Sequence, residues 1–120
     1  MASSPAFRDR VLSRLLAFGP VQARAMFSGY GLYMDGVMFA LIARDTLYLK
    51  ADAANRDDFE RAGAAPFTYR GRSRPIEMSY WQVPDDVFGD PLSLADWAAK
   101  AHNAARRTKA TKREGKRSRR

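Results

Sequence analysis

The apolar residues of the first eighteen positions recur at spacings of three and four. They are Phe7, Val11, Leu12, Leu15, Leu16 and Phe18. Such spacing gathers them on one helical face and leaves the charged residues on the other. Ser4 followed by Pro5 suits the start of a helix, because serine is a favoured N-cap and proline is tolerated at the first helical position. The sequence therefore predicts a helix over residues 5–18, which Gly19-Pro20 ends.

Beyond residue 20 the apolar residues alternate with other residues, which is typical of β-strands. A strand is predicted over residues 21–27, and the chain is then expected to turn at residues 28–31. Asp35-Gly36 separates two apolar runs, and this dipeptide favours a two-residue hairpin because both positions tolerate positive φ. The run 37–43 is apolar on both faces, so we expect a strand in the interior of the sheet. Another strand follows over residues 46–50.

The second half of the chain predicts one more hairpin between two helices. A mostly polar segment over residues 55–62 is expected to be a short helix that Gly63 ends. Residues 67–70 and 76–83 are expected to pair as strands. From residue 92 to about residue 106, apolar and alanine residues again recur at three and four, which predicts a terminal helix. The order α-β-β-β-α-β-β-α predicts a two-layer α+β domain with a five-stranded, mainly antiparallel sheet.

Most of the net charge lies at the end of the chain. The 120 residues have a formal net charge of +8, but residues 1–105 balance twelve Lys or Arg against twelve Asp or Glu. Residues 106–120 hold one Glu and nine basic residues: Arg106, Arg107, Lys109, Lys112, Arg113, Lys116, Arg117, Arg119 and Arg120. This segment has no aliphatic residue larger than alanine. We therefore predict a folded domain over residues 1–105 and a disordered basic tail over residues 106–120.

The charge of this tail predicts electrostatic contact with nucleic acid or another polyanion. The tail has no aromatic side chain for base stacking and no rigid scaffold to present base-reading groups. We therefore expect the contact to be independent of nucleic-acid sequence. A solvated extension without a partner is the alternative.

Composition excludes several classes of site. The sequence has no cysteine and one histidine, His102, which excludes disulfides, thiolate chemistry and metal centres built from these residues. We expect no metal, no cofactor and no catalytic residue. His102 lies off the apolar stripe of the terminal helix, so we expect it at the surface. No apolar run is long enough to span a membrane and no secretory signal is evident, so we expect a cytoplasmic protein.

The paired glycines Gly29 and Gly31 suggest a dinucleotide-binding loop, which requires a third glycine followed by a helix. The third position is Met34, and a strand is predicted to follow. We therefore interpret the pair as part of a turn in which at least one glycine has positive φ. The acidic residues within 55–62 alternate with arginines, and we interpret them as a solvated face rather than an acid–base pair.

The aromatic residues allow two interpretations. Tyr80 and Trp81, together with Tyr69, Tyr30 and Tyr33, are expected to pack in the core and on a half-buried outer face. The alternative is a platform on which bases stack. Because neighbouring residues of a strand point to opposite faces, at most one of Tyr80 and Trp81 contributes to such a platform.

Several short motifs occur along the chain in a characteristic order. They are Arg24-Ala25-Met26-Phe27-Ser28-Gly29-Tyr30-Gly31-Leu32-Tyr33, Asp35-Gly36-Val37-Met38-Phe39-Ala40-Leu41-Ile42, Leu47-Tyr48-Leu49-Lys50, Pro66-Phe67-Thr68-Tyr69, Met78-Ser79-Tyr80-Trp81, Trp97-Ala98 and Ala104-Ala105-Arg106-Arg107. Over about residues 5–107 the sequence resembles the N-terminal domain of the TfoX/Sxy family. Within these motifs, Arg24, Met26, Phe27, Gly29, Tyr30, Gly31, Tyr80 and Trp81 are interpreted as structural residues.

The resemblance implies the α+β fold, a bacterial source and a regulatory role. Named members of the family regulate natural competence and are thought to act with the cyclic-AMP receptor protein at promoters. They are longer and carry a second, C-terminal domain, and no catalytic residues are established for the family. The resemblance thus implies a small non-enzymatic module whose domain contacts a protein partner, a regulator or part of the transcription machinery. The charge of the tail adds the expected contact with nucleic acid.

A small ligand-binding protein or enzyme, with a site between sheet and helices, is the alternative. A deep pocket with converging polar groups would favour that alternative. A flat apolar sheet face would favour a protein partner or a homodimer.

Overall fold

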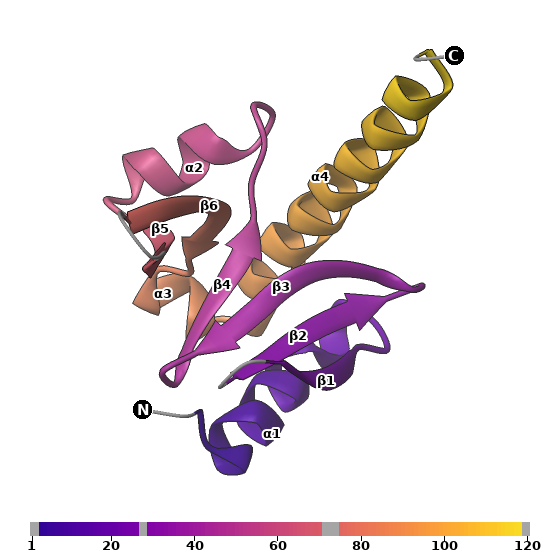
Figure 1. The fold of residues 1–120 in the computed structure, drawn as a ribbon. Helices are drawn as coiled ribbons and strands as arrows, with labels where there is room; N and C mark the ends of the chain where they lie inside the picture. Colours follow the sequence, from indigo (N-terminus) through magenta and orange to yellow (C-terminus); the bar gives the residue numbers. More distant parts are fainter. Residues whose placement is uncertain (1–2, 27–28, 71–74, 119–120) are drawn as a thin grey trace.

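The computed structural model describes residues 3–26, 29–70 and 75–118. Figure 1 shows a sheet flanked by helices, with the last helix continuing well past the sheet. The elements are α1 (Pro5–Arg14), the 3-10 helix η1 (Leu15–Ala17), β1 (Gln22–Met26), β2 (Gly29–Met34), β3 (Val37–Ala43), β4 (Thr46–Lys50), α2 (Arg56–Arg61), β5 (Pro66–Arg70), β6 (Pro75–Gln82), α3 (Asp85–Phe88) and α4 (Pro91–Ser118).

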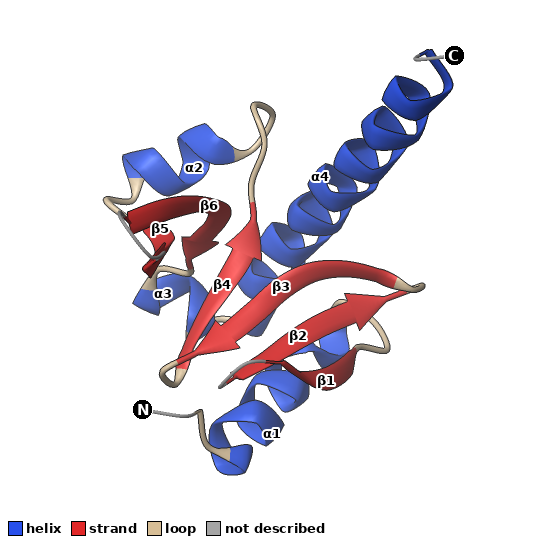
Figure 2. Ribbon diagram, viewed as in Figure 1, coloured by secondary structure: helices blue, strands red, loops and turns tan. Residues whose placement is uncertain are grey.

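The strands form one antiparallel sheet in the order β1-β2-β3-β4-β6-β5 (Figure 2). The predicted α+β class is confirmed, and β3 lies inside the sheet as expected. The strand count is six rather than five, because the residues from Gly29 onward form a strand of their own. Gly29, Tyr30 and Gly31 pair with Met26, Ala25 and Arg24 of β1, so the turn predicted at 28–31 is wrong for these three residues.

Local signals position the first helix and the hairpins. Ser4 caps α1, and its hydroxyl accepts a hydrogen bond from the Phe7 amide at 3.1 Å. Asp35 and Gly36 join β2 to β3 with φ angles of 52° and 74°, as the Asp-Gly signal predicts. Arg44-Asp45 joins β3 to β4 with φ angles of 53° and 54°. Both turns therefore use two residues in the left-handed region.

The helices pack on one face of the sheet around a single core. Val11 of α1, Phe59 of α2, Val87 of α3 and Leu94 of α4 belong to one buried cluster with Leu32 of β2. Fully buried side chains such as Phe39, Phe59 and Leu94 fill the space between the two layers. The two-layer arrangement follows from this shared core.

Helix α4 is longer than the sequence predicts. It was expected to end near residue 106 and to precede a disordered tail, whereas α4 continues to Ser118. Its alanine side is buried against the sheet through Ala98, Ala101 and Ala105. None of the helices in the described part of the chain combines the length and apolarity needed to cross a membrane. The division into a domain over 1–105 and a tail stays a prediction.

Candidate functional site

The two faces of the sheet differ in what covers them. The face that holds Leu32, Ala40 and Leu49 contacts the helices, and these residues are fully buried. Strand residues alternate between faces, so Tyr33, Leu41 and Tyr48 lie on the opposite side. All helical elements contribute to the first face. In the described parts of the chain the second face is therefore left without a helix, and we name it the open face.

The open face carries aromatic and thioether side chains from successive strands. Its described residues are Gln22, Arg24, Met26, Gly29, Gly31, Tyr33, Met38, Leu41, Ala43, Thr46, Tyr48, Lys50, Phe67, Tyr80 and Gln82. The rings of Tyr48 and Phe67 meet edge to face, with centroids 5.0 Å apart. Tyr33, Tyr48, Tyr80 and Met38 are half-buried. The face is thus apolar in its rings and partly accessible to solvent.

Cations lie over or beside these rings. The Arg24 guanidinium is 4.9 Å from the Tyr33 ring centroid, and the Lys50 ammonium is 5.3 Å from that of Tyr80. Lys50 also donates a hydrogen bond to the Ser79 hydroxyl at 2.5 Å. Among the described side chains of the open face, none is a carboxylate. The electrostatic character of this surface is therefore positive.

Two phenols of the open face, Tyr48 and Tyr80, stay protonated at neutral pH. Burial raises the pKa of Tyr80 to about 12, and the nearby Tyr33 adds to this rise. Burial likewise raises the pKa of Tyr48, while the positive charge of Arg44 lowers it in part. Both hydroxyls can therefore donate hydrogen bonds at physiological pH.

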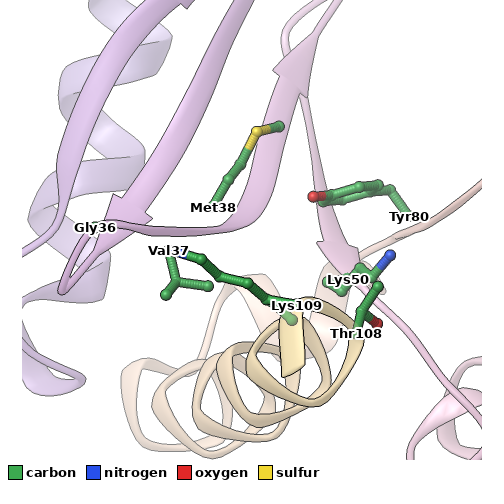
Figure 3. A pocket seen from close by; sticks show the side chains of 8 residues that line it. Gly36, Val37, Met38, Lys50, Tyr80, Thr108 and Lys109 are labelled. Atoms are coloured by element: carbon green, nitrogen blue, oxygen red, sulfur yellow. The ribbon is translucent and has the colours of Figure 1, made fainter. Parts of the chain in front are cut away.

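A cavity of about 250 Å³ lies where the open face meets α4 (Figure 3). Met38, Lys50 and Tyr80 line it from the sheet, and Thr108 and Lys109 line it from the helix. Figure 3 shows these side chains gathered around the same space. The Thr108 hydroxyl donates to the Ala104 carbonyl at 3.0 Å. The cavity joins the aromatic sheet face to the basic end of α4.

The basic residues at the root of the predicted tail have different environments. Arg107 forms two hydrogen bonds with the Asp52 carboxylate, at 2.7 and 3.0 Å. Hydrogen bonding by Arg107 lowers the pKa of Asp52. Arg106 and Lys109 are exposed. Residues 112, 113, 116 and 117 lie within the helix, while Arg119 and Arg120 lie outside the described residues.

The predicted motif residues divide between the two faces of the sheet. Arg24, Met26, Gly31 and Tyr80 lie on the open face, whereas Tyr30 and Trp81 pack against the core. The Arg8 guanidinium lies 5.3 Å from the Tyr30 ring centroid. Phe27 lies outside the described residues. The structural role of this set stays a prediction.

The positive φ predicted for Gly29 or Gly31 is wrong. Among the described glycines, Gly19, Gly36 and Gly63 have positive φ. Close approach of the Ile42 backbone requires glycine at position 29, whereas position 31 is surrounded by flexible side chains. A Cβ on Gly29 would lie 1.9 Å from the Ile42 carbonyl oxygen, and one on Gly31 would lie 3.0 Å from the Met26 sulfur.

His102 is buried rather than exposed as predicted. It is 6% exposed, and its Nε2 lies 2.9 Å from the Met34 carbonyl oxygen. Since a carbonyl only accepts, Nε2 carries the proton in this contact. The imidazole also meets the rings of Phe18 and Phe39 edge-on. His102 therefore ties α4 to the end of β2.

One acidic residue of α2, Asp58, forms ion pairs at the domain surface. Asp58 contacts Arg61 at 2.8 Å and Lys100 of α4 at 3.6 Å. Among the described residues, no three acidic or histidine side chains are placed to hold a metal ion together. The Asp58 carboxylate therefore links α2 to α4.

A family model described as the TfoX N-terminal domain matches residues 13–105. The chain belongs to this family. The resemblance noted in the sequence is thereby confirmed, and the family match spans all six strands and the sheet-packed part of α4. The match therefore covers the sheet together with α2, α3 and this part of α4, while most of α1 precedes it.

Two curated relatives are bacterial. Protein Sxy of Escherichia coli (strain K12) is 24% identical over 98 residues, which are 82% of this chain and 47% of that protein. DNA transformation protein TfoX1 of Aliivibrio fischeri (strain ATCC 700601 / ES114) is 26% identical over 86 residues, which are 72% of this chain and 41% of that protein. The chain thus matches less than half the length of either relative.

Proposed function

We propose that this chain is a non-enzymatic regulatory module that contacts DNA through the basic end of α4 and a protein partner through its domain. Membership of the TfoX N-terminal domain family supports a regulatory role. One relative is named a DNA transformation protein, which makes DNA the polyanion to test. The observation that carries the DNA contact is the placement of the basic segment on a helix that continues past the sheet (Figure 1).

The root of this segment is fixed to the domain by one of its own arginines. Arg107 is held by Asp52, while Arg106 and Lys109 remain exposed beside it. A helix held at its base presents cations to the phosphates of a duplex without presenting a base-reading fork. We expect binding that is strong at low salt and independent of sequence.

The protein contact is supported by two exposed leucines on the helical side. Leu16 and Leu92 are 74% and 78% exposed, which makes them the exposed large apolar residues of the described part of the chain. Their sequence neighbours Ala17 and Pro91 line a cavity of about 390 Å³ together with Arg10, Ser13 and Arg14. Exposed apolar side chains beside a concavity are typical of a protein interface.

The DNA contact is tested with two matched double variants. Lys112→Gln with Lys116→Gln removes two charges from the end of α4, and Arg56→Gln with Arg61→Gln removes two from α2. Binding of a 20-base-pair duplex is measured by fluorescence anisotropy over a salt series. All nine basic residues together would give a log–log salt slope of about −8. Because Asp52 holds Arg107, we expect a shallower slope.

The α4 pair is expected to weaken binding and to reduce the salt slope by about two, since each lost phosphate contact contributes about one. The α2 pair is expected to leave both unchanged. Equal effects of the two pairs would move the DNA contact away from α4 and refute this part of the proposal.

A further inference from the structure

We propose that the open face binds single-stranded DNA, with bases stacked on its aromatic side chains and phosphates held by the adjacent cations. This inference rests on the proposed function, because it extends the DNA contact from α4 onto the sheet. It assigns to the domain a preference for single-stranded over double-stranded DNA, which the basic helix alone does not supply.

The first argument is the placement of the rings. Tyr33 comes from β2, Tyr48 from β4 and Tyr80 from β6, and all three are half-buried on one face. Strands are about 4.8 Å apart, so these rings extend across about 14 Å of sheet. Aromatic side chains on such a sheet stack unpaired bases, which a duplex keeps inside its own stack.

The second argument is the charge of the face. Arg24 lies over Tyr33, Lys50 lies over Tyr80, and Arg44 is close enough to Tyr48 to affect its pKa. Bases stack on guanidinium planes as well as on rings, so Arg24 extends the Tyr33 surface rather than blocking it. With no carboxylate among the described side chains of the face, an anionic chain is complementary to it.

The same charge disfavours a second copy of this chain as the occupant. A two-fold dimer would place this face against itself, bringing Arg24 and its neighbours towards cations of the same sign. No described carboxylate of the face is available to pair with them. The polyanion is therefore the better match.

The third argument is continuity with α4. The cavity of about 250 Å³ between Tyr80, Met38 and Lys109 lies at the end of the row of rings. A DNA strand that runs off the sheet at this cavity meets Lys109 and then the basic end of α4 (Figure 3). The open face and the basic end of α4 thus form one continuous binding path for single-stranded DNA.

The chain offers a matched pair of variants for the test. Tyr30 and Tyr33 lie on the same strand, and each has an arginine guanidinium over its ring, at 5.3 and 4.9 Å. They point to opposite faces. Binding of fluorescein-labelled (dT)15 to the full chain is measured by anisotropy at low salt, with the urea midpoint of each variant as the folding control.

Tyr33→Leu is expected to weaken (dT)15 binding by about five- to hundredfold, the range observed when one stacked ring is removed. Tyr33→Phe keeps the ring and is expected to stay within about twofold of the wild type. Tyr30→Leu is expected to keep wild-type affinity when its folded fraction is taken into account. Binding of the duplex through α4 is expected to be unchanged in Tyr33→Leu.

Equal affinity in Tyr33→Leu and the wild type, or equal loss in Tyr30→Leu and Tyr33→Leu, would overturn the proposal. Competition by polyglutamate as strong as by unlabelled (dT)15 would also overturn it, since the face would then recognise charge without stacking. If the double variant Lys112→Gln with Lys116→Gln binds the duplex as tightly as the wild type, only the proposed DNA contact of α4 is refuted. The comparison of Tyr30→Leu with Tyr33→Leu still tests whether the open face binds single-stranded DNA.

Discussion

Replacement of Gly29 by alanine tests how closely β2 and β3 approach. A Cβ on Gly29 would lie 1.9 Å from the Ile42 carbonyl oxygen and 3.0 Å from its carbon. Both contacts are with backbone, which cannot rotate away as a side chain can. Ordinary contacts of a Cβ begin at about 3.4 Å, so the two strands must separate locally by about 1.5 Å.

The cost follows from what this separation disrupts. Tyr30 pairs with Ile42 next to the clash, so one or two ladder hydrogen bonds weaken, at about 1 kcal/mol each. Forcing an extra methyl into a packed site adds about 1–3 kcal/mol. We expect Gly29→Ala to lower the free energy of unfolding by about 2–4 kcal/mol, a large share of the stability of a small domain.

Gly31→Ala is the matched control on the same strand. Its Cβ would meet the sulfurs of Met26 and Met38 at 3.0 and 3.2 Å, and thioether side chains can adjust. We expect a loss below about 1 kcal/mol. Urea unfolding followed by tryptophan fluorescence and circular dichroism gives both values, with unchanged m. A Gly29→Ala protein as stable as Gly31→Ala would refute the close approach.

Three further outcomes are expected. Unfolded tyrosine ionises near pH 10, whereas Tyr80 keeps its proton to about pH 12. The stability of the wild type should therefore fall by about 2 kcal/mol between these two pH values relative to that of Tyr80→Phe, measured as urea midpoints. Equal falls in the two proteins would contradict this. The pKa of Asp52 is lowered by Arg107, so Asp52→Asn should cost about 0.5–1 kcal/mol at pH 7, and this difference should vanish as the pH falls through the lowered pKa; a difference independent of pH would exclude the ion pair as its cause. His102→Ala should cost about 2–4 kcal/mol in urea unfolding because it opens a cavity beside Phe18 and Phe39 and leaves the Met34 carbonyl unpaired, and a loss below about 0.5 kcal/mol would contradict its buried position.

Elements with strong local signals were predictable from the sequence. The Asp35-Gly36 hairpin and the Ser4 cap depend on the preferences of a few adjacent residues, and both are present in the structure. The turn predicted at Gly29 is wrong because the requirement for glycine there arises from the Ile42 backbone, which is distant in sequence. Glycine is typical both of turns and of positions where two backbones approach closely, so the sequence alone did not distinguish the two cases.

The extent of α4 and the open face were less predictable. The segment after Arg107 lacks core-forming residues, yet seven of its thirteen residues are Lys or Arg. Both have high helix propensity, and this was the available signal for a longer helix. The open face depends on the pairing of β2, β4 and β6, which brings together tyrosines more than forty residues apart. Strand order is not encoded in local spacing, so their grouping required the structure.

Photocrosslinking to DNA tests the central claim most directly. The full chain is crosslinked to a 4-thiothymidine-containing (dT)15 and the modified residues are mapped by mass spectrometry. Because Tyr30 and Tyr33 share β2 but face opposite sides, residue-level mapping separates the two faces. The account predicts crosslinks at Tyr33 and Tyr80 together with residues 106–118, and none at Tyr30. Crosslinks confined to α1, α2 and α3 would contradict it.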